Sequence, residues 1–427
     1  MKGFLGFLVV LLLILGGLAA IVQWPNAVPG GPAIAAAVTN IAMQLNLPWP
    51  SNSDKVEGDR AWASYQSLKE RTTNGSDLDV LKTAVTHLQA YVDTPRGNQD
   101  VGAVTKLGDA LVEQGQRLKD VDLTQAIESF SRAYALDKTN EPALEGRAWS
   151  HHDRAVKMRE GSIPASANLQ PDDDLREAVA DFSLALQISL DAQRAYDAQK
   201  NKPLAADEVD AMKLVKERAA RLPELYIGRG RAYLGQGRYD EAIADFTEAV
   251  KIAPSSVEGY QWRGFAQGKK AVANNNDKQL FTAAYSDFGQ ALANAGDSPE
   301  GHQRAEVLLY RAQTRRDDPT PNMTYKTAMS DLDDAKKIAP SRADLHYEAS
   351  LTALQIVQAL DTTKASYSSC RSSKAKDYCQ QDPAQLDTTR KGLKETAKNE
   401  SQQARDLEPA NKKYNDQFSV ATAASGI

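Results

Sequence analysis

The sequence predicts an all-α protein: a solenoid of about six helical hairpins with inserted helices and loops, preceded by one transmembrane helix. Three observations favour this fold class. A short pattern of small and apolar residues recurs along most of the chain, aromatic residues make up only 7% of the composition, and one long apolar run stands near the N-terminus. The 427 residues exceed one small domain and suit a repeat array. The net charge of −5 argues against nucleic acid as a partner, because phosphate binding needs clustered positive charge.

The first element is the apolar run at residues 4–22, FLGFLVVLLLILGGLAAIV. As a helix it would be about 28 Å long, close to the thickness of a bilayer core, so residues 1–23 are predicted to be a transmembrane helix or signal anchor. Lys2 is the only charge before Asp54 and places the N-terminus in the cytoplasm. The repeat domain would then be extracytoplasmic, and periplasmic in a bacterium. The alternative is a cleaved signal peptide, with "GGLAA" as the cleavage region.

Residues 24–53 carry no charge, with Trp24-Pro25 at one end and Trp49-Pro50 near the other. Apolar residues inside this segment recur at helical spacing: Ile34, Val38, Ile41 and Leu45. The pattern predicts a short amphipathic helix within residues 33–47 that lies at the membrane interface. Packing on a membrane partner is one alternative, and a flexible spacer is another.

A degenerate helical hairpin is expected at residues 54–99, and the repeat array comes after it in the chain. The signature of the repeat array is the pattern A-x3-F-x2-A, seen at Ala242, Phe246 and Ala249. The pattern recurs at 126/130/133, 178/182/185 and 284/288/291, with Leu in place of Phe at 328/332/335. Spacings of four and three put these residues on one helical face. Each such helix is preceded by another that carries a small residue, at Gly108, Ala148, Gly230, Gly264 and Ala312.

One stretch, residues 223–256, shows the pattern most completely, with Tyr226, Gly230, Tyr233, Gly237, Tyr239, Ala242, Phe246, Ala249 and Pro254. It resembles the tetratricopeptide repeat, a 34-residue helix–turn–helix unit. The resemblance covers residues 100–409 and implies a protein–protein interaction array. The last repeat departs from the family pattern at Ser401, where Phe belongs, and is expected to act as a cap before a C-terminal tail at 410–427. "GRGRAYLGQG" is therefore a packing joint between helices, since a phosphate loop needs a preceding strand.

Charged residues also recur in the repeats. An Arg precedes the small residue and an Asp precedes the aromatic or leucine, which gives four candidate structural clamps: Arg147 with Asp181, Arg229 with Asp245, Arg263 with Asp287, and Arg311 with Asp331. In an antiparallel hairpin the two positions should face each other, and the alternative is ordinary surface charge.

Insertions fall between the first and second helix of the hairpins and would elaborate one edge of the array. An additional helical hairpin is expected between the second and third repeats, and the edge could dock a partner or a membrane, or reflect neutral drift of loops. The longest gap holds both cysteines, Cys370 and Cys379, which would form a disulfide in an oxidising compartment. Two free thiols are the alternative.

The sequence carries no catalytic motif that we recognise, so we expect no enzyme, no cofactor and no metal site; His151 and His152 point about 100° apart on a helix, which is awkward for a metal. The family resemblance implies partner binding in a groove lined by first helices, at Glu145, Trp149, Ile227, Arg231, Leu234, Gln261, Phe265, Leu309, Gln313 and Arg316. The expected function is a membrane-anchored scaffold or adaptor, a subunit or assembly factor of an envelope membrane complex. The partners would be proteins, with the membrane contacted through residues 4–22 and 33–47. One alternative is a secreted or periplasmic peptide-binding module, and another is an enzyme of unknown type.

Overall fold

The computed structural model describes residues 53–68, 76–118, 123–166, 169–199, 208–296, 301–320, 323–362, 370, 373–380, 382–409 and 411–425. Within these ranges the chain is helical, and extended pairing is limited to one isolated bridge between Ser166 and Leu169. The predicted all-helical repeat fold is thus confirmed. The chain divides into two compact parts, Met1–Asp153 and Arg154–Ile427, with the boundary inside helix α7 (Glu141–Arg159).

The predicted membrane topology is corrected. Among the helices that the structure describes, none combines the length and the apolar character needed to cross a bilayer. The prediction of a single-pass membrane protein, with a cytoplasmic N-terminus and an extracytoplasmic repeat domain, is therefore not retained. The apolar run at 4–22 and the predicted amphipathic helix at 33–47 lie outside the described residues.

The N-terminal part begins with the hairpin of α3 (Ser53–Leu68) and α4 (Ser76–Val92), where the sequence analysis places a degenerate repeat. The short η2 (Gly97–Gln99) leads into the next hairpin, α5 (Val101–Leu118) and α6 (Thr124–Leu136), and then into α7. The core of this part includes the fully buried side chains of Tyr65, Leu88 and Phe130. The ring of Phe130 fills the space beside Gly108 and Gly146, where an added Cβ would lie 2.6 and 2.3 Å from ring carbons.

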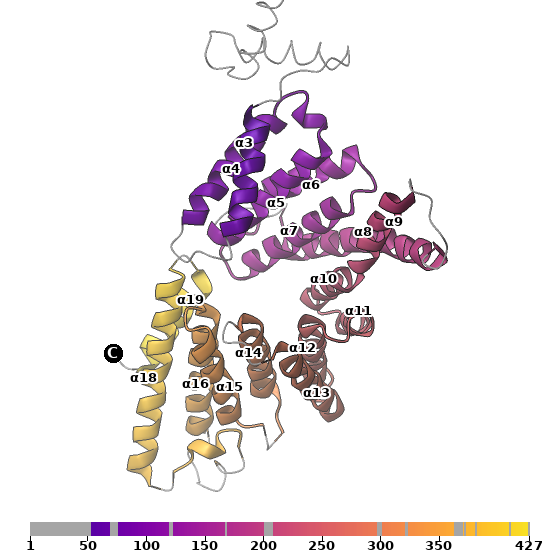
Figure 1. Ribbon diagram of the computed structural model, residues 1–427. Coiled ribbons are helices and arrows are strands. Elements are labelled where there is room, and N and C mark those ends of the chain that lie inside the picture. The colour runs from indigo at the N-terminus through magenta and orange to yellow at the C-terminus, as the bar shows by residue number, and fades with distance from the viewer. Residues whose placement is uncertain are drawn as a thin grey trace, which may run out of the picture. The chain divides into compact units, whose positions relative to one another are not determined.

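The C-terminal part contains successive helical hairpins that can be followed along the chain in Figure 1. Each hairpin has a first and a second helix. They are α10 (Leu222–Gly235) with α11 (Tyr239–Ile252), α12 (Val257–Ala273) with α13 (Lys278–Ala295), α14 (His302–Asp317) with α15 (Tyr325–Ile338), and α16 (Ala343–Thr362) with α18 (Pro383–Leu407). First helices pack against the first helices of the neighbouring hairpins, as α10 does with α12 and α12 with α14.

The recurring sequence pattern is the packing pattern of these hairpins. Ala242, Phe246 and Ala249 on α11 are completely buried, and the same holds at the equivalent positions of α13. An added Cβ at Gly230 would lie 2.7 Å from the Phe246 ring, and one at Gly228 would lie 2.5 Å from the ring of Phe182 on the preceding second helix. Each second-helix ring is thus accommodated by glycines, and burial of these rings supplies much of the driving force for stacking hairpins.

The turn between α10 and α11 explains a further glycine of the repeat at residues 223–256. Gly237 has φ +73°, a backbone conformation that glycine adopts without steric cost. The glycine-rich stretch is therefore a helix–turn–helix joint, as the sequence analysis expects.

Two insertions become helix. The helix α8 (Pro171–Gln199) is 29 residues long, and α9 (Glu208–Ala220) packs against it, so the expected additional hairpin is formed by one long helix and one extra helix. The insertion between α12 and α13 lengthens both of these helices. They are joined by a tight turn, in which Asn275 and Asn276 have positive φ. The Asp277 side chain accepts hydrogen bonds from the first turn of α13 and starts that helix.

The C-terminal end of the array is closed by α19 (Lys412–Ser425), which lies within the residues expected to be a tail and packs against α16 and α18. Tyr414, Gln417 and Ala421 on α19 are buried. Ser401, where the repeat pattern has Phe, is completely buried, and a small residue there lets α18 approach α16 closely. The Ser350 hydroxyl on α16 donates to a backbone carbonyl of α18 and accepts from Gln417.

Candidate partner-binding surface

The first helices of the C-terminal part contact one another along one side, which we call the inner surface. Its central feature is an aromatic cluster formed by Trp262 and Phe265 on α12 and Tyr310 on α14. The ring centroid of Tyr310 lies 4.6 Å from that of Trp262 and 4.7 Å from that of Phe265. Phe265 and Tyr310 are half-buried, so neither residue is fully covered by the rest of the chain. Aromatic side chains of this kind are common anchors in protein interfaces.

Charged groups surround the aromatic cluster. The Arg231 guanidinium from α10 lies over the Trp262 ring, 4.6 Å from its centroid. The Gln261 amide of α12 donates to the Glu306 carboxylate of α14 at 3.2 Å. Burial raises the pKa of Glu258, and the negative charges of Glu306 and Glu224 raise it further, against the opposing effect of Arg231. Three carboxylates, those of Glu224, Glu258 and Glu306, therefore interact with one guanidinium, that of Arg231, on this part of the inner surface.

The inner surface continues onto α16 through polar contacts. The Gln313 amide of α14 donates to Glu348 of α16 at 3.0 Å, and the Arg316 guanidinium donates to the same carboxylate. Burial alone would lower the pKa of Arg316, but Glu348 and Asp317 outweigh it and raise that pKa. Lys269 of α12 forms an ion pair with Asp317 at 3.1 Å. These contacts fix the spacing of three first helices.

The predicted groove residues differ in how deeply their side chains are buried. Ile227, Gln261 and Leu309 are 4%, 1% and 3% exposed, so they form the floor between helices rather than a contact surface. Arg231, Leu234, Phe265, Gln313 and Arg316 are half-buried on the first helices of the C-terminal part. Glu145 and Trp149 lie on α7 in the N-terminal part, where the Trp149 ring meets His152 edge-on at 5.4 Å.

Several inner-surface residues escape the sequence analysis, although a signal for them exists. Each of the last four first helices has a small residue at the same repeat position: Gly230, Gly264, Ala312 and Ser350. An acidic residue stands six positions before each of them, at Glu224, Glu258, Glu306 and Asp344. Aligning the repeats on the small residue would have revealed this acidic row. Trp262 and Tyr310 likewise share one repeat position, two residues before the small residue.

Three of the four candidate clamps are ion pairs that join the two helices of a hairpin. The guanidinium nitrogens of Arg229 lie 2.8 Å from both carboxylate oxygens of Asp245. Arg263 and Asp287 are joined in the same way at 2.8 and 2.7 Å. The third pair, Arg311 with Asp331, has distances of 3.0 and 2.6 Å. The fourth candidate, Arg147 and Asp181, has its residues in the two different parts of the chain, and Arg147 donates to Ser131 at 3.2 Å.

These clamps are structural. Burial raises the pKa of the Asp245 carboxyl, so the bidentate contact with Arg229 is what holds its negative charge in place. Arg229 also donates to the Ser183 hydroxyl of α8 at 3.2 Å and so links one hairpin to the preceding one.

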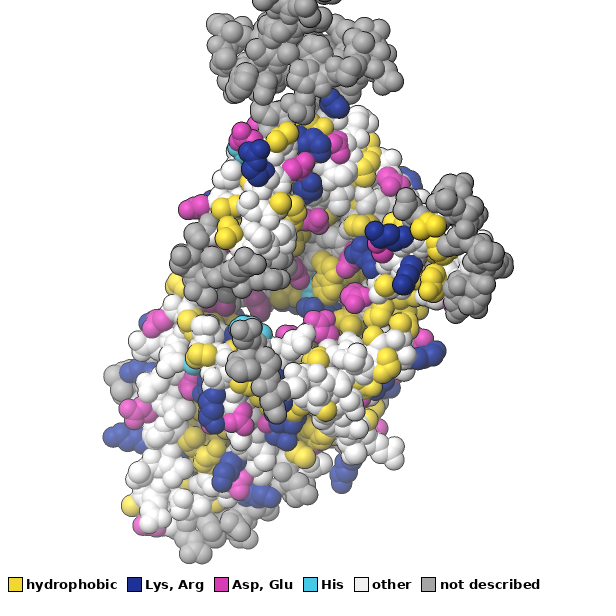
Figure 2. Space-filling view, in the orientation of Figure 1, with side chains coloured by type: hydrophobic (Ala, Val, Ile, Leu, Met, Phe, Trp, Pro, Cys, Tyr) yellow, Lys and Arg dark blue, Asp and Glu magenta, His cyan; other side chains and the backbone are white. Residues whose placement is uncertain are grey.

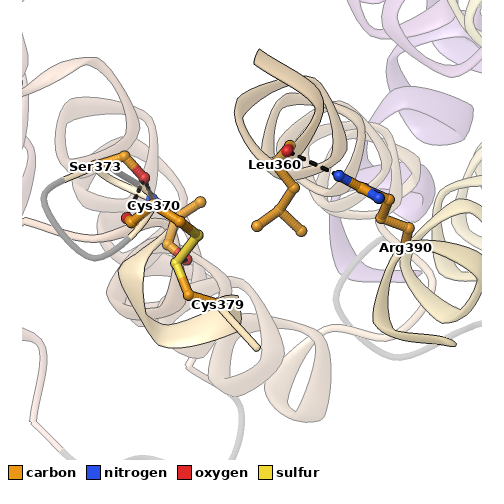
Figure 3. Close-up of a disulfide and its surroundings, with 6 residues drawn as sticks. Leu360, Cys370, Ser373, Cys379 and Arg390 are labelled. Carbon is orange, nitrogen blue, oxygen red and sulfur yellow. Dashed lines mark hydrogen bonds between the residues drawn. A yellow bond between two sulfur atoms is a disulfide. The ribbon is translucent and has the colours of Figure 1, made fainter. Parts of the chain in front are cut away.

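The predicted disulfide between Cys370 and Cys379 is present (Figure 3). Within the loop that it closes, the Ser373 hydroxyl donates to the Cys370 carbonyl at 2.7 Å. The same loop presents Lys374, whose ammonium donates to the carbonyls of Arg315 and Arg316 at 2.8 and 2.5 Å, at the C-terminal end of α14. Burial lowers the pKa of Lys374 to about 8. The loop therefore caps the C-terminus of α14.

Among the described residues, no group of three or more His, Cys, Asp or Glu side chains is arranged to hold a metal ion. His152 is 5% exposed, and one of its ring nitrogens lies 3.0 Å from the Asp153 carboxylate. On the face shown in Figure 2, basic and acidic side chains are interspersed.

Comparisons with known proteins agree with the repeat that the structure shows. Residues 223–256 match the family model of the tetratricopeptide repeat. Among solved structures, the chain is similar to a tetratricopeptide repeat protein from Parabacteroides merdae, with 14% identity, a TM-score of 0.48, and coverage of 84% of this chain and 99% of that one. No curated protein matches the sequence.

Two further solved structures are similar. The APC/C hetero-tetramer Cut9–Hcn1 has 14% identity and a TM-score of 0.43, over 86% of this chain and 52% of the other. The assembly chaperone of RpL4 has 15% identity and a TM-score of 0.39, over 72% and 99%. The family match is thus to one repeat, residues 223–256, which lies within an array of helical hairpins.

Proposed function

We propose that this protein is an interaction scaffold that binds a segment of a partner protein on the inner surface formed by α10, α12, α14 and α16. The observation that carries the proposal is the partly exposed aromatic cluster on this surface, bordered by the acidic row. A tetratricopeptide-like fold is typical of protein–protein interaction scaffolds, which supports the same reading. The predicted membrane complex is not part of the proposal, because the single-pass topology on which it depended is overturned.

The chemistry of the surface favours an amphipathic segment with basic side chains. The half-buried rings of Phe265 and Tyr310 offer apolar contact. Acidic residues in the first turn of a helix are also favoured by the helix dipole, which would account for Glu224, Glu258 and Asp344. Glu306 stands beyond the first turn of α14, so the dipole does not account for the whole row. Burial is the main cause of the raised pKa of Glu258, and a Lys or Arg of a partner would offset the additional repulsion from Glu306 and Glu224.

The test places a photo-crosslinking amino acid at Glu258 on the inner surface in the full-length chain, expressed in its source cells. The matched control has the same amino acid at Thr247, which is exposed on the second helix α11. We expect a defined partner segment to be crosslinked from position 258 and not from position 247. Mass spectrometry of the crosslinked peptide identifies the segment and its charge. Equal crosslinking from both positions, or crosslinking from position 247 alone, would contradict the proposal.

A further inference from the structure

His346 occupies an unusual position at the junction of α15, α16 and α18. Its side chain is only 7% exposed. One ring nitrogen, Nδ1, lies 2.6 Å from a carboxylate oxygen of Glu400 on α18. The other, Nε2, lies 2.9 Å from the carbonyl oxygen of Pro340, in the turn between α15 and α16. The imidazole therefore connects three successive segments of the array through its two nitrogens.

The two contacts together define the protonation state of the ring. A neutral imidazole has one N–H donor and one acceptor nitrogen, whereas the imidazolium cation has two donors. The Pro340 carbonyl is an acceptor in every state, and an ionised Glu400 is an acceptor as well. Lys336 of α15 donates to the second oxygen of Glu400 at 2.5 Å, which favours the ionised carboxylate. Both contacts are hydrogen bonds only when His346 carries a positive charge.

From this geometry we propose that His346 is a pH-sensitive latch, which in its charged form fastens α18 to α16 and to the turn between α15 and α16. When the proton is lost, a nitrogen lone pair faces either the Glu400 carboxylate or the Pro340 carbonyl, and the contact changes from attractive to repulsive. This proposal does not depend on the function proposed above.

The charged groups around His346 agree with this assignment. On α18, the hydrogen bond that His346 donates to Glu400 raises the pKa of His346 against the opposing effect of burial, and the Pro340 carbonyl raises it further. On α15, Lys336 opposes the charge, but it is shared between Glu400 and Asp333, which lies 3.1 Å from it. Burial would raise the pKa of Glu400, but hydrogen bonds from His346 and Lys336 lower it.

The other two helices packed against α16 direct their polar groups elsewhere. From α14, Arg316 forms an ion pair with Glu348. From α19, the Tyr414 ring lies 5.3 Å from the ring of Tyr347.

The sign of the pH dependence follows from linkage. The pKa of His346 is raised in the folded chain above its ordinary value. The stabilisation is fully present below about pH 6.5, the ordinary histidine pKa, and is lost as pH rises through the raised folded value. Above that window α18 should be held less firmly.

The test uses the full-length protein and two variants. His346→Gln removes the titrating ring, and the matched control His302→Gln removes an exposed histidine at the start of α14. Thermal unfolding is measured from pH 5.5 to 9, with hydrogen exchange of α18 at matched intrinsic rates. We expect the wild type and His302→Gln to lose Tm across the window, by roughly 3–5 °C for each unit by which the folded pKa exceeds the unfolded one. His346→Gln should lack this loss, and profiles that are parallel for all three proteins would overturn the latch.

A second measurement applies even if His346→Gln does not fold. In protein with isotope-labelled histidine, NMR should show both ring nitrogens of His346 protonated at a pH just above 6.5. The variant Glu400→Gln should move the midpoint of this titration to a lower pH. A ring that is neutral at that pH in the wild type, or a midpoint unchanged by Glu400→Gln, would overturn the proposal.

Discussion

Replacing Gly230 by alanine tests the packing logic of the repeats most sharply. The new Cβ would stand 2.7 Å from a ring carbon of Phe246, where ordinary contact begins at 3.4 Å, so the ring or the helix must move by about 0.7 Å. Overpacking of this kind costs about 1–3 kcal/mol, while alanine gains about 1 kcal/mol of helix propensity over glycine. The net change in the free energy of unfolding should be a loss of about 0–2 kcal/mol.

The matched control is Gly289→Ala on α13, a helical position with no atom within 4 Å of the added Cβ. Without a clash, this variant should gain about 0.5–1 kcal/mol. Urea unfolding of both variants gives the difference, expected to be about 1–3 kcal/mol. Adding Phe246→Leu should remove most of the penalty of Gly230→Ala, because the ring that meets the new methyl group is gone. A Gly230→Ala protein as stable as Gly289→Ala would refute the reasoning.

Three further perturbations follow from the contacts described above. Asp287→Ala leaves the Arg263 guanidinium without its bidentate partner and should cost about 3 kcal/mol in urea unfolding, whereas replacing both residues by Leu and Met should recover most of that loss. Reduction of the Cys370–Cys379 disulfide should lower the stability of the C-terminal part by about 2–3 kcal/mol, since the closed loop is short; a Cys370→Ser variant should be insensitive to reductant in the same thermal melts. Lys374→Met should speed hydrogen exchange at the C-terminal end of α14 and leave α10 unchanged, and unaltered exchange at α14 would contradict the capping role.

The elements that the sequence predicts well are those in which one residue type serves one packing need. The pattern of Ala242, Phe246 and Ala249 recurs because the same face of the second helix is buried in successive hairpins, and the position of Gly230 takes a small residue because a ring lies against it. The packing role of Gly228 could not be predicted from one repeat, because its neighbour Phe182 belongs to the preceding second helix and the contact exists only once hairpins are stacked.

Depth and topology were harder to predict. The repeat register indicates that Ile227 and Leu309 point toward the inner side, but their burial depends on how closely neighbouring first helices approach. The helix α19 could not be predicted from the repeat pattern, because Tyr414 and Ala421 do not follow that pattern and are buried only against α16 and α18. The predicted membrane topology was wrong: it depended on the length of one apolar run, and no helix among the described residues meets the requirements for crossing a bilayer.

Binding of the crosslinked partner segment to the purified protein tests the central claim most directly. The affinity of the synthetic segment is compared between the wild type, Glu258→Lys on the inner surface, and Glu395→Lys, which makes the same charge change at an exposed site on α18. The account predicts about tenfold weaker binding for Glu258→Lys, equivalent to about 1.4 kcal/mol, and wild-type affinity for Glu395→Lys. Equal affinities for all three proteins, or a loss confined to Glu395→Lys, would contradict binding on the inner surface.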